Sequence, residues 1–106
     1  MTIILRIMTS LVFAAGLYTA ALAQSAQSTN IEIKNFMYMP VTVPAGGTVT
    51  WRNDGEELHT LTSDSGLFRS GGLDTGQTFS FKFDKPGTYQ YLCCIHPQMQ
   101  GTITVT

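Results

Sequence analysis

Residues 79–93 read Phe-Ser-Phe-Lys-Phe-Asp-Lys-Pro-Gly-Thr-Tyr-Gln-Tyr-Leu-Cys, and this stretch decides the fold. Aromatic residues alternate with polar ones on both sides of the central Lys-Pro-Gly, which is typical of half-buried β-strands. Pro86 and Gly87 suit the two central positions of a type II turn. The stretch therefore predicts two strands joined by a turn, and the second strand places Cys93 on the same face as its two tyrosines.

The same alternation recurs from residue 31 onward, and turn-forming residues separate the runs. Apolar or aromatic residues spaced by two are Ile31 and Ile33, Phe36 and Tyr38, Val41 and Val43, Val49 and Trp51, and Ile103 and Val105. His59 and Leu61 are also in phase, so a strand here would send both side chains to one face. Residues 63–78 are rich in Gly, Ser, Asp and Thr, and we expect an ordered loop with short extended pieces. Because residues 24–106 contain no segment of helical period, the chain predicts an antiparallel β-sandwich of about seven short strands.

The first 23 residues have the pattern of a secretory signal peptide. Arg6 precedes the apolar run 7–22, and Ala21-Leu22-Ala23 provides a small-x-small cleavage site. The alternative is an uncleaved membrane anchor, but hydroxyl-bearing residues interrupt the run, and it is shorter than the usual span of about 20 residues. We therefore expect a signal peptide at 1–23, cleavage after Ala23, a periplasmic location and no stable membrane insertion.

Residues 24–106 then form a single small domain, which we expect to be a monomer. The full chain carries six basic and seven acidic residues, and one of the basic residues is the Arg6 of the signal peptide. A nucleic-acid-binding surface would be basic, so this balance argues against a nucleic-acid partner. A core of this size leaves little stability to spare, so a bound metal would contribute visibly to stability.

The residues that follow the aromatic strand combine three kinds of metal ligand. Cys93, His96 and Met99 have the spacing Cys-x2-His-x2-Met, and His59 is the other of the two histidines. Two imidazoles, a thiolate and a weakly bound thioether form the ligand set of a blue-copper electron-transfer site. The pattern therefore points to one mononuclear copper that alternates between Cu(I) and Cu(II).

The two adjacent cysteines have different expected roles. Export favours a disulfide as the default reading of two cysteines. However, adjacent α-carbons lie about 3.8 Å apart, whereas ordinary disulfides need about 4.4–6.8 Å. Strand parity directs Cys93 inward and Cys94 outward, so we assign Cys93 as the ligand and Cys94 as a thiol outside the site. This parity also disfavours a binuclear copper centre, in which both cysteines would face one cavity.

Taken together, the motifs resemble the cupredoxin family, and most closely its small amicyanin-like and plastocyanin-like blue-copper members. The resemblance extends over nearly all of residues 24–106. It rests on Phe36-x-Tyr38-x-Pro40, Gly46-x-Thr48-Val49-x-Trp51-x-Asn53, His59-Thr60, the aromatic alternation of residues 79–93 and His96-Pro97-x-Met99-x-Gly101.

The resemblance implies a Greek-key sandwich and a complete site. His59, Cys93 and His96 would form a trigonal plane around copper, with Met99 as the distant axial ligand. Asn53 and Thr60 match positions that, in the family, tie the loop of the first histidine to the loop of the cysteine. The short Cys-x2-His-x2-Met loop is similar to that of amicyanin. Cys94 departs from the family, where a residue without a thiol is usual.

The resemblance also implies an electron carrier. His96 and Pro97 would dock briefly on redox partners, with a periplasmic dehydrogenase as donor and a c-type cytochrome as acceptor. The alternative is a periplasmic copper carrier or resistance protein without redox turnover. Met37 and Met39 also raise the hypothesis of a methionine-rich surface that takes up copper. This hypothesis is weaker than the other two, because both residues fit a strand face. We do not expect an enzyme, since four protein ligands leave no open position for a substrate.

Overall fold

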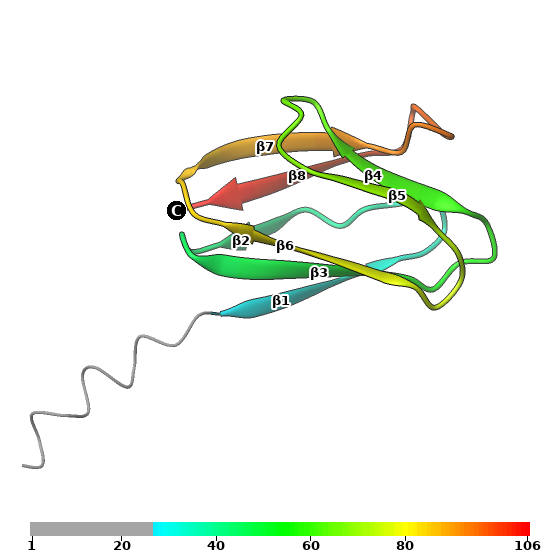
Figure 1. Cartoon of the computed structure of the whole chain (residues 1–106), viewed down its shortest axis with the longest axis horizontal. Helices are drawn as coiled ribbons and strands as arrows, with labels where there is room; N and C mark the ends of the chain where they lie inside the picture. The colour runs from blue at the N-terminus through cyan, green and yellow to red at the C-terminus, as the bar shows by residue number, and fades with distance from the viewer. Residues whose placement is uncertain (1–26) are drawn as a thin grey trace, which may run out of the picture.

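The computed structural model describes residues 27–106, and the predicted signal peptide at 1–23 lies outside the described residues. The described strands are β1 (Ser28–Ile33), β2 (Val41–Val43), β3 (Gly47–Asn53), β4 (His59–Ser63), β5 (Arg69–Leu73), β6 (Thr78–Phe83), β7 (Gly87–Leu92) and β8 (Gln100–Val105). Figure 1 shows them as two facing layers. Within this part of the chain, no helix is long and apolar enough to cross a membrane.

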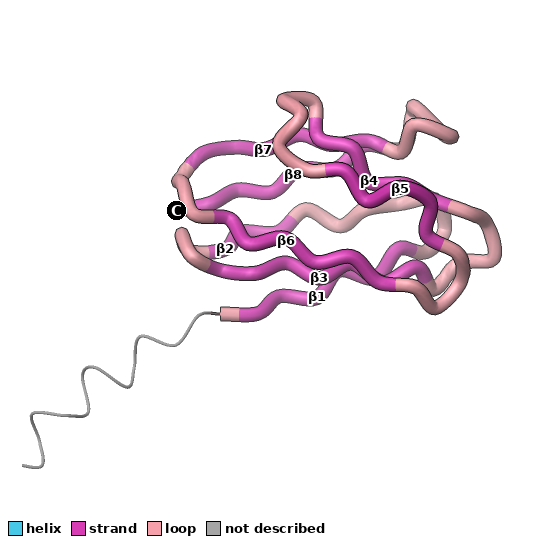
Figure 2. The backbone as a smooth tube through the Cα atoms, in the orientation of Figure 1, coloured by secondary structure: helices cyan, strands magenta, loops and turns pink. Residues whose placement is uncertain are grey.

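The all-β sandwich predicted from the sequence is confirmed, with eight strands rather than about seven. One sheet has the order β1-β3-β6 and the other the order β2-β8-β7-β4-β5. Most neighbours are antiparallel, but β1 pairs with β3 and β2 pairs with β8 in parallel. These parallel pairs arise because the chain crosses from one sheet to the other between β1 and β2, as the tube in Figure 2 shows.

The aromatic stretch 79–93 spans both layers. Its two halves are β6 and β7, and these belong to different sheets, so the Lys-Pro-Gly turn carries the chain across the sandwich. Both strands alternate because each has one face toward the shared core: Phe83 and Tyr91 are buried, while Phe79 and Phe81 are half-buried.

Met37 and Met39, which the sequence predicts on a strand face, lie exposed between β1 and β2, outside the named strands. Two strand boundaries also differ from the sequence prediction. The first strand begins at Ser28 instead of Ile31, because residues 28–30 pair with residues 48–50 of β3. The segment 63–78, expected to be an ordered loop with short extended pieces, contains the regular strand β5, which pairs with β4. Backbone pairing alone explains both differences, since these segments carry few apolar side chains and therefore give no alternation.

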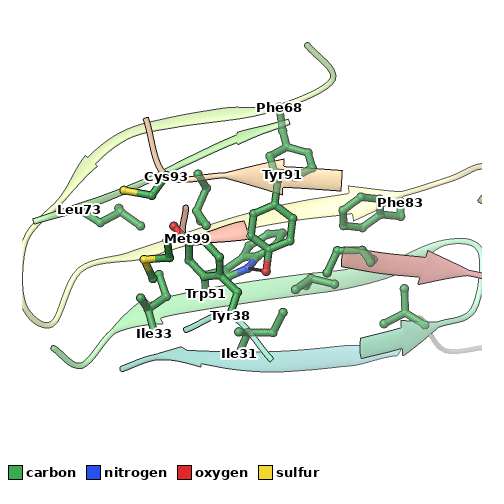
Figure 3. Close-up of a cluster of buried hydrophobic side chains, with 14 of the residues drawn as sticks. Ile31, Ile33, Tyr38, Trp51, Phe68, Leu73, Phe83, Tyr91, Cys93 and Met99 are labelled. Carbon is green, nitrogen blue, oxygen red and sulfur yellow. Dashed lines mark hydrogen bonds between the residues drawn. The ribbon is translucent and has the colours of Figure 1, made fainter. Parts of the chain in front are cut away.

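Trp51 and Tyr91 form the centre of the core (Figure 3). The indole Nε1 of Trp51 donates a hydrogen bond to the hydroxyl of Tyr91, at 3.1 Å. Glycine is required at position 101, because a Cβ there would lie 2.5 Å from the Tyr91 hydroxyl and closer still to its ring. At one end of this core lie the sulfur atoms of Cys93 and Met99.

Candidate copper site

Three neighbouring strands bring the predicted ligands to one end of the sandwich. His59 is the first residue of β4, Cys93 directly follows β7, and Met99 directly precedes β8. β7 pairs antiparallel with both β4 and β8. The start of β4, the end of β7 and the start of β8 therefore lie at the same end of the sheet. The loop that joins β7 to β8, orange in Figure 1, carries His96 at this end of the sheet.

The separations of the donor atoms fit a single metal ion. The Sγ of Cys93 lies 3.7 Å from Nδ1 of His96 and 4.0 Å from Nδ1 of His59. First-row metals bind imidazole nitrogen at about 2.0 Å and thiolate sulfur at about 2.3 Å. Two such ligands at a trigonal angle lie about 3.7 Å apart by that geometry. All three donor atoms lie within 4.8 Å of one another, so one ion can contact them all.

The two imidazoles differ in their exposure to solvent. His59 and Cys93 are almost wholly buried, whereas His96 is half-buried and therefore reaches the surface. Met99 is also buried, and its sulfur lies at the same end of the core as that of Cys93 (Figure 3). The site thus has a buried side and one imidazole edge that solvent or a partner can approach.

The short loop that carries three of these residues is held by its own backbone. The amide of His96 donates to the carbonyl of Cys93 at 3.2 Å, and the amide of Met99 donates to the carbonyl of His96 at 2.8 Å. The amide of Cys93 donates to the carbonyl of Met99 at 3.0 Å and closes the loop. The ligand spacing is therefore fixed by hydrogen bonds that need no metal.

The thiol of Cys93 ionises more easily than an ordinary thiol. Burial raises its pKa, but hydrogen bonds from the Thr60 amide and from His59 and His96 outweigh burial and lower the pKa to about 6. The thiolate is the form that binds metal. The lowered pKa therefore favours the thiolate form of Cys93, the form that a metal would bind.

Thr60 links the first histidine strand to the cysteine loop. Its amide donates to the Sγ of Cys93 at 3.4 Å, and its hydroxyl accepts a hydrogen bond from the amide of Cys94 at 2.8 Å. The same hydroxyl donates to the Sγ of Cys94 at 3.2 Å, and the hydroxyl of Tyr38 donates to the Thr60 carbonyl at 2.6 Å. Cys94 itself is exposed.

Asn53 supports the other side of the site. Its amide nitrogen donates to the carbonyls of Glu57 and Leu73, both at 2.8 Å, and its Oδ1 accepts from the amide of Gly55 at 2.9 Å. These bonds fasten the 54–58 loop that leads directly into His59. They do not run to the cysteine loop, so Asn53 fixes the approach to the first histidine rather than a link between the two loops.

Phe36 contacts both imidazoles, a role that its sequence pattern does not predict. Its ring meets His59 at a centroid distance of 5.4 Å and His96 at 5.1 Å, with both pairs nearly perpendicular. Asn35 and Phe36 have φ angles of +55° and +56°. The alternation of residues 36 and 38 could not reveal this contact, because it depends on a turn conformation that a bulky residue rarely adopts.

Comparison with known proteins agrees with this geometry. A family model described as the cupredoxin-like domain matches residues 7–105. Amicyanin-alpha of Methylorubrum extorquens is 36% identical over 99 residues, which cover 87% of this chain and 83% of that protein. Plastocyanin of Scenedesmus fuscus is 40% identical over 78 residues, which cover 61% of this chain and 80% of that protein. The match to amicyanin and plastocyanin agrees with the expectation that this protein is not an enzyme.

Solved structures show the same architecture. A purple cupredoxin from Nitrosopumilus maritimus superposes with a TM-score of 0.69 at 34% identity, covering 74% of this chain and 99% of that one. A Cu(I) form of an amicyanin variant superposes with a TM-score of 0.70 at 27% identity, covering 79% and 88%. The chain therefore belongs to the cupredoxin family, and its cluster of His59, Cys93, His96 and Met99 is typical of a type 1 copper site.

Proposed function

We propose that this protein is an exported carrier of single electrons that uses one type 1 copper. His59, Cys93 and His96 would be the ligands in the trigonal plane, and Met99 the axial ligand. The observation that carries this proposal is the placement of two imidazole nitrogens within 4.0 Å of one thiol sulfur. Copper in such a mixed site supplies one-electron chemistry, because thiolate and thioether suit Cu(I) while imidazole also suits Cu(II).

The protein supplies ligands that move little when the charge of the site changes. The three backbone bonds of the loop hold Cys93, His96 and Met99, and Asn53 holds the segment before His59. The Thr60 amide hydrogen-bonded to the Cys93 sulfur stabilises negative charge on that atom. A rigid, hydrogen-bonded ligand set favours fast electron exchange, because little rearrangement accompanies each step.

The docking surface would surround the exposed edge of His96. Phe36 is 51% exposed and Ile95 is 47% exposed, and Pro97 is also exposed beside the histidine. This surface is apolar, and weak redox encounters bury small areas, below about 1,200 Å² in total. By similarity to amicyanin, a periplasmic dehydrogenase would be the donor and a c-type cytochrome the acceptor.

Export forms part of the same proposal. If the signal peptide is cut after Ala23, the protein recovered from the periplasm should begin at Gln24. N-terminal sequencing or intact mass measurement of that fraction tests this directly. Recovery of uncut chain in the membrane fraction would support the anchor alternative.

Repeated redox cycling distinguishes an electron carrier from a copper carrier. The mature protein is loaded with Cu(II) and placed inside a dialysis membrane, with a second copper-binding protein, free of metal, on the outside. It is then reduced with ascorbate and reoxidised with ferricyanide, and its copper content is measured after each cycle. An electron carrier keeps its copper and recovers its colour in full. Stepwise loss of copper to the acceptor on reduction would instead support copper carriage.

The colour of the oxidised protein adds information about the site. One of the similar structures is described as a purple cupredoxin. The thiolate-to-copper absorption of this protein would be intense and blue if Met99 is only weakly bound. A purple spectrum would place this site with that relative and would call for a stronger axial interaction.

A further inference from the structure

A tight turn places an aromatic ring against both candidate imidazole ligands. The amide of Met37 donates to the carbonyl of Lys34 at 3.2 Å, and the two residues form an isolated antiparallel bridge. Asn35 and Phe36 are the central residues of this turn. The ring of Phe36 lies nearly perpendicular to His59 and His96, at interplanar angles of 85° in both pairs.

The residue type at position 36 conflicts with the local backbone. Positive φ at both central positions is the pattern of a type I′ turn, for which Asn-Gly is the strongly preferred pair. Here the pair is Asn35-Phe36, with φ of +55° and +56°. A left-handed conformation is strained for a bulky residue, and such strain persists where the surroundings or function require it.

Core packing does not account for this strain. The side chain of Phe36 is 51% exposed, so half of its surface lies outside the protein interior. Its aromatic contacts are with His59 and His96, and it has no part in the Trp51–Tyr91 cluster of the described core. The ring therefore lies on the site rather than in the core.

We propose that Phe36 is a positioning residue that holds both imidazoles by their contacts with one aromatic ring and slows the release of copper. The three rings form a closed triangle, since His59 and His96 also lie 5.4 Å apart. Neither imidazole can rotate or swing outward without losing an edge-to-face contact. The inference rests on the proposed function in taking both histidines as copper ligands.

The decisive variant is Phe36→Gly, because it removes the ring and also gives the turn its preferred Asn-Gly pair. The apo-protein should unfold at the same temperature as the wild type or at a higher one. Release of Cu(I) from the reduced protein to bicinchoninate should be faster by roughly tenfold, as expected from the loss of two aromatic contacts. Phe36→Tyr keeps the ring and should restore slow release.

Met37→Ala is the matched control. Met37 lies in the same turn and is 58% exposed, comparable to Phe36, yet its side chain is outside the ring triangle. This variant should release copper at the wild-type rate. If it releases copper as fast as Phe36→Gly, the effect belongs to exposed apolar surface in general and the proposal is wrong.

The remaining outcomes also decide. Unchanged copper release in Phe36→Gly would overturn the proposal, and so would a fall in apo-protein melting temperature large enough to explain the faster release. A readout without copper separates this inference from the proposed function: the imidazole NMR signals of His59 and His96 in the apo-protein should broaden in Phe36→Gly. If the signals broaden in Phe36→Gly but the copper-loaded wild type shows no type 1 spectrum, the positioning role stands and the copper function is refuted. If the wild type shows a type 1 spectrum but Phe36→Gly changes neither the apo-protein signals nor the rate of copper release, only the role of Phe36 is refuted.

Discussion

The hydroxyl of Thr60 offers a sharp test of how the site is assembled. It accepts a hydrogen bond from the amide of Cys94 at 2.8 Å and donates one to the Sγ of Cys94 at 3.2 Å. Thr60→Val replaces this hydroxyl with a methyl group of similar shape and keeps the β-branched side chain suited to a strand. The substitution removes these two bonds and the longer one that the hydroxyl donates to the Sγ of Cys93 at 3.8 Å, but it keeps the bond from the Thr60 amide to that sulfur.

The expected loss follows from the group that is left without a partner. Thr60 is 6% exposed, so its bonds lie in a largely dry region. A buried donor without a partner costs about 1–3 kcal/mol. Because the bond from the Cys94 amide is only part-buried and Cys94 itself is exposed, we expect Thr60→Val to lower the free energy of unfolding of the apo-protein by about 1–2 kcal/mol.

Thr62→Val is the matched control on the same strand. The Oγ1 of Thr62 is buried and has no hydrogen-bond partner among the described residues. Removing an unsatisfied buried hydroxyl relieves a desolvation penalty, so this substitution should raise stability by about 1 kcal/mol. The two substitutions are chemically identical and lie two residues apart, yet their effects should have opposite signs.

Urea unfolding of the apo-proteins, followed by tryptophan fluorescence of Trp51, measures both changes. A difference of 1 kcal/mol corresponds to about 4–8 °C in melting temperature for a domain of this size, so calorimetry provides an independent check. Equal losses in Thr60→Val and Thr62→Val would refute the reasoning. The same outcome would mean that the hydroxyl contacts of Thr60 contribute nothing beyond the general cost of altering β4.

Three further changes have definite expected outcomes. Gly101→Ala should destabilise the apo-protein by about 1–3 kcal/mol in urea unfolding, because the new Cβ would overlap the Tyr91 ring; a change below about 0.5 kcal/mol would contradict this packing. Asn53→Ala should cost about 2–4 kcal/mol in the same assay, since three hydrogen bonds are lost, whereas a loss under about 1 kcal/mol would show that water replaces them. In apo Cys94→Ser, the ultraviolet thiolate absorbance of Cys93 should titrate near pH 6. The stability gained from that ionisation is complete above the ordinary thiol pKa of about 8.5 and is lost as the pH falls through about 6. If the midpoint of the absorbance titration lies near the ordinary value instead, the hydrogen bonds to the Cys93 sulfur do not form in solution.

Strands with one buried face could be predicted from the sequence, and those held by backbone pairing could not. Phe83 and Tyr91 alternate with polar residues because one side of each strand faces the core, so the pattern predicts both β6 and β7. The segment Arg69–Leu73 carries two central glycines and gives no alternation, although it pairs with β4. The parallel pairing of β1 with β3 also depends on long-range topology, which local patterns do not encode.

The candidate site also has residues that the sequence predicts and residues that it does not. Cys93, His96 and Met99 lie in one short loop, so their spacing alone predicts a shared site. The bonds of Asn53 and the contacts of Phe36 depend instead on loop conformations. In particular, the side chain of Phe36 reaches the imidazoles through a left-handed turn that the sequence pattern disfavours.

The most direct test is the visible and paramagnetic-resonance spectrum of the copper-loaded mature protein and of its two single-cysteine variants. The thiolate of Cys93 should give the wild type an intense thiolate-to-copper absorption band with the resonance signal of a type 1 site. Cys94→Ser should keep both signatures and Cys93→Ser should lose both. A band that survives the loss of Cys93, or disappears with the loss of Cys94, would contradict the assignment of the site.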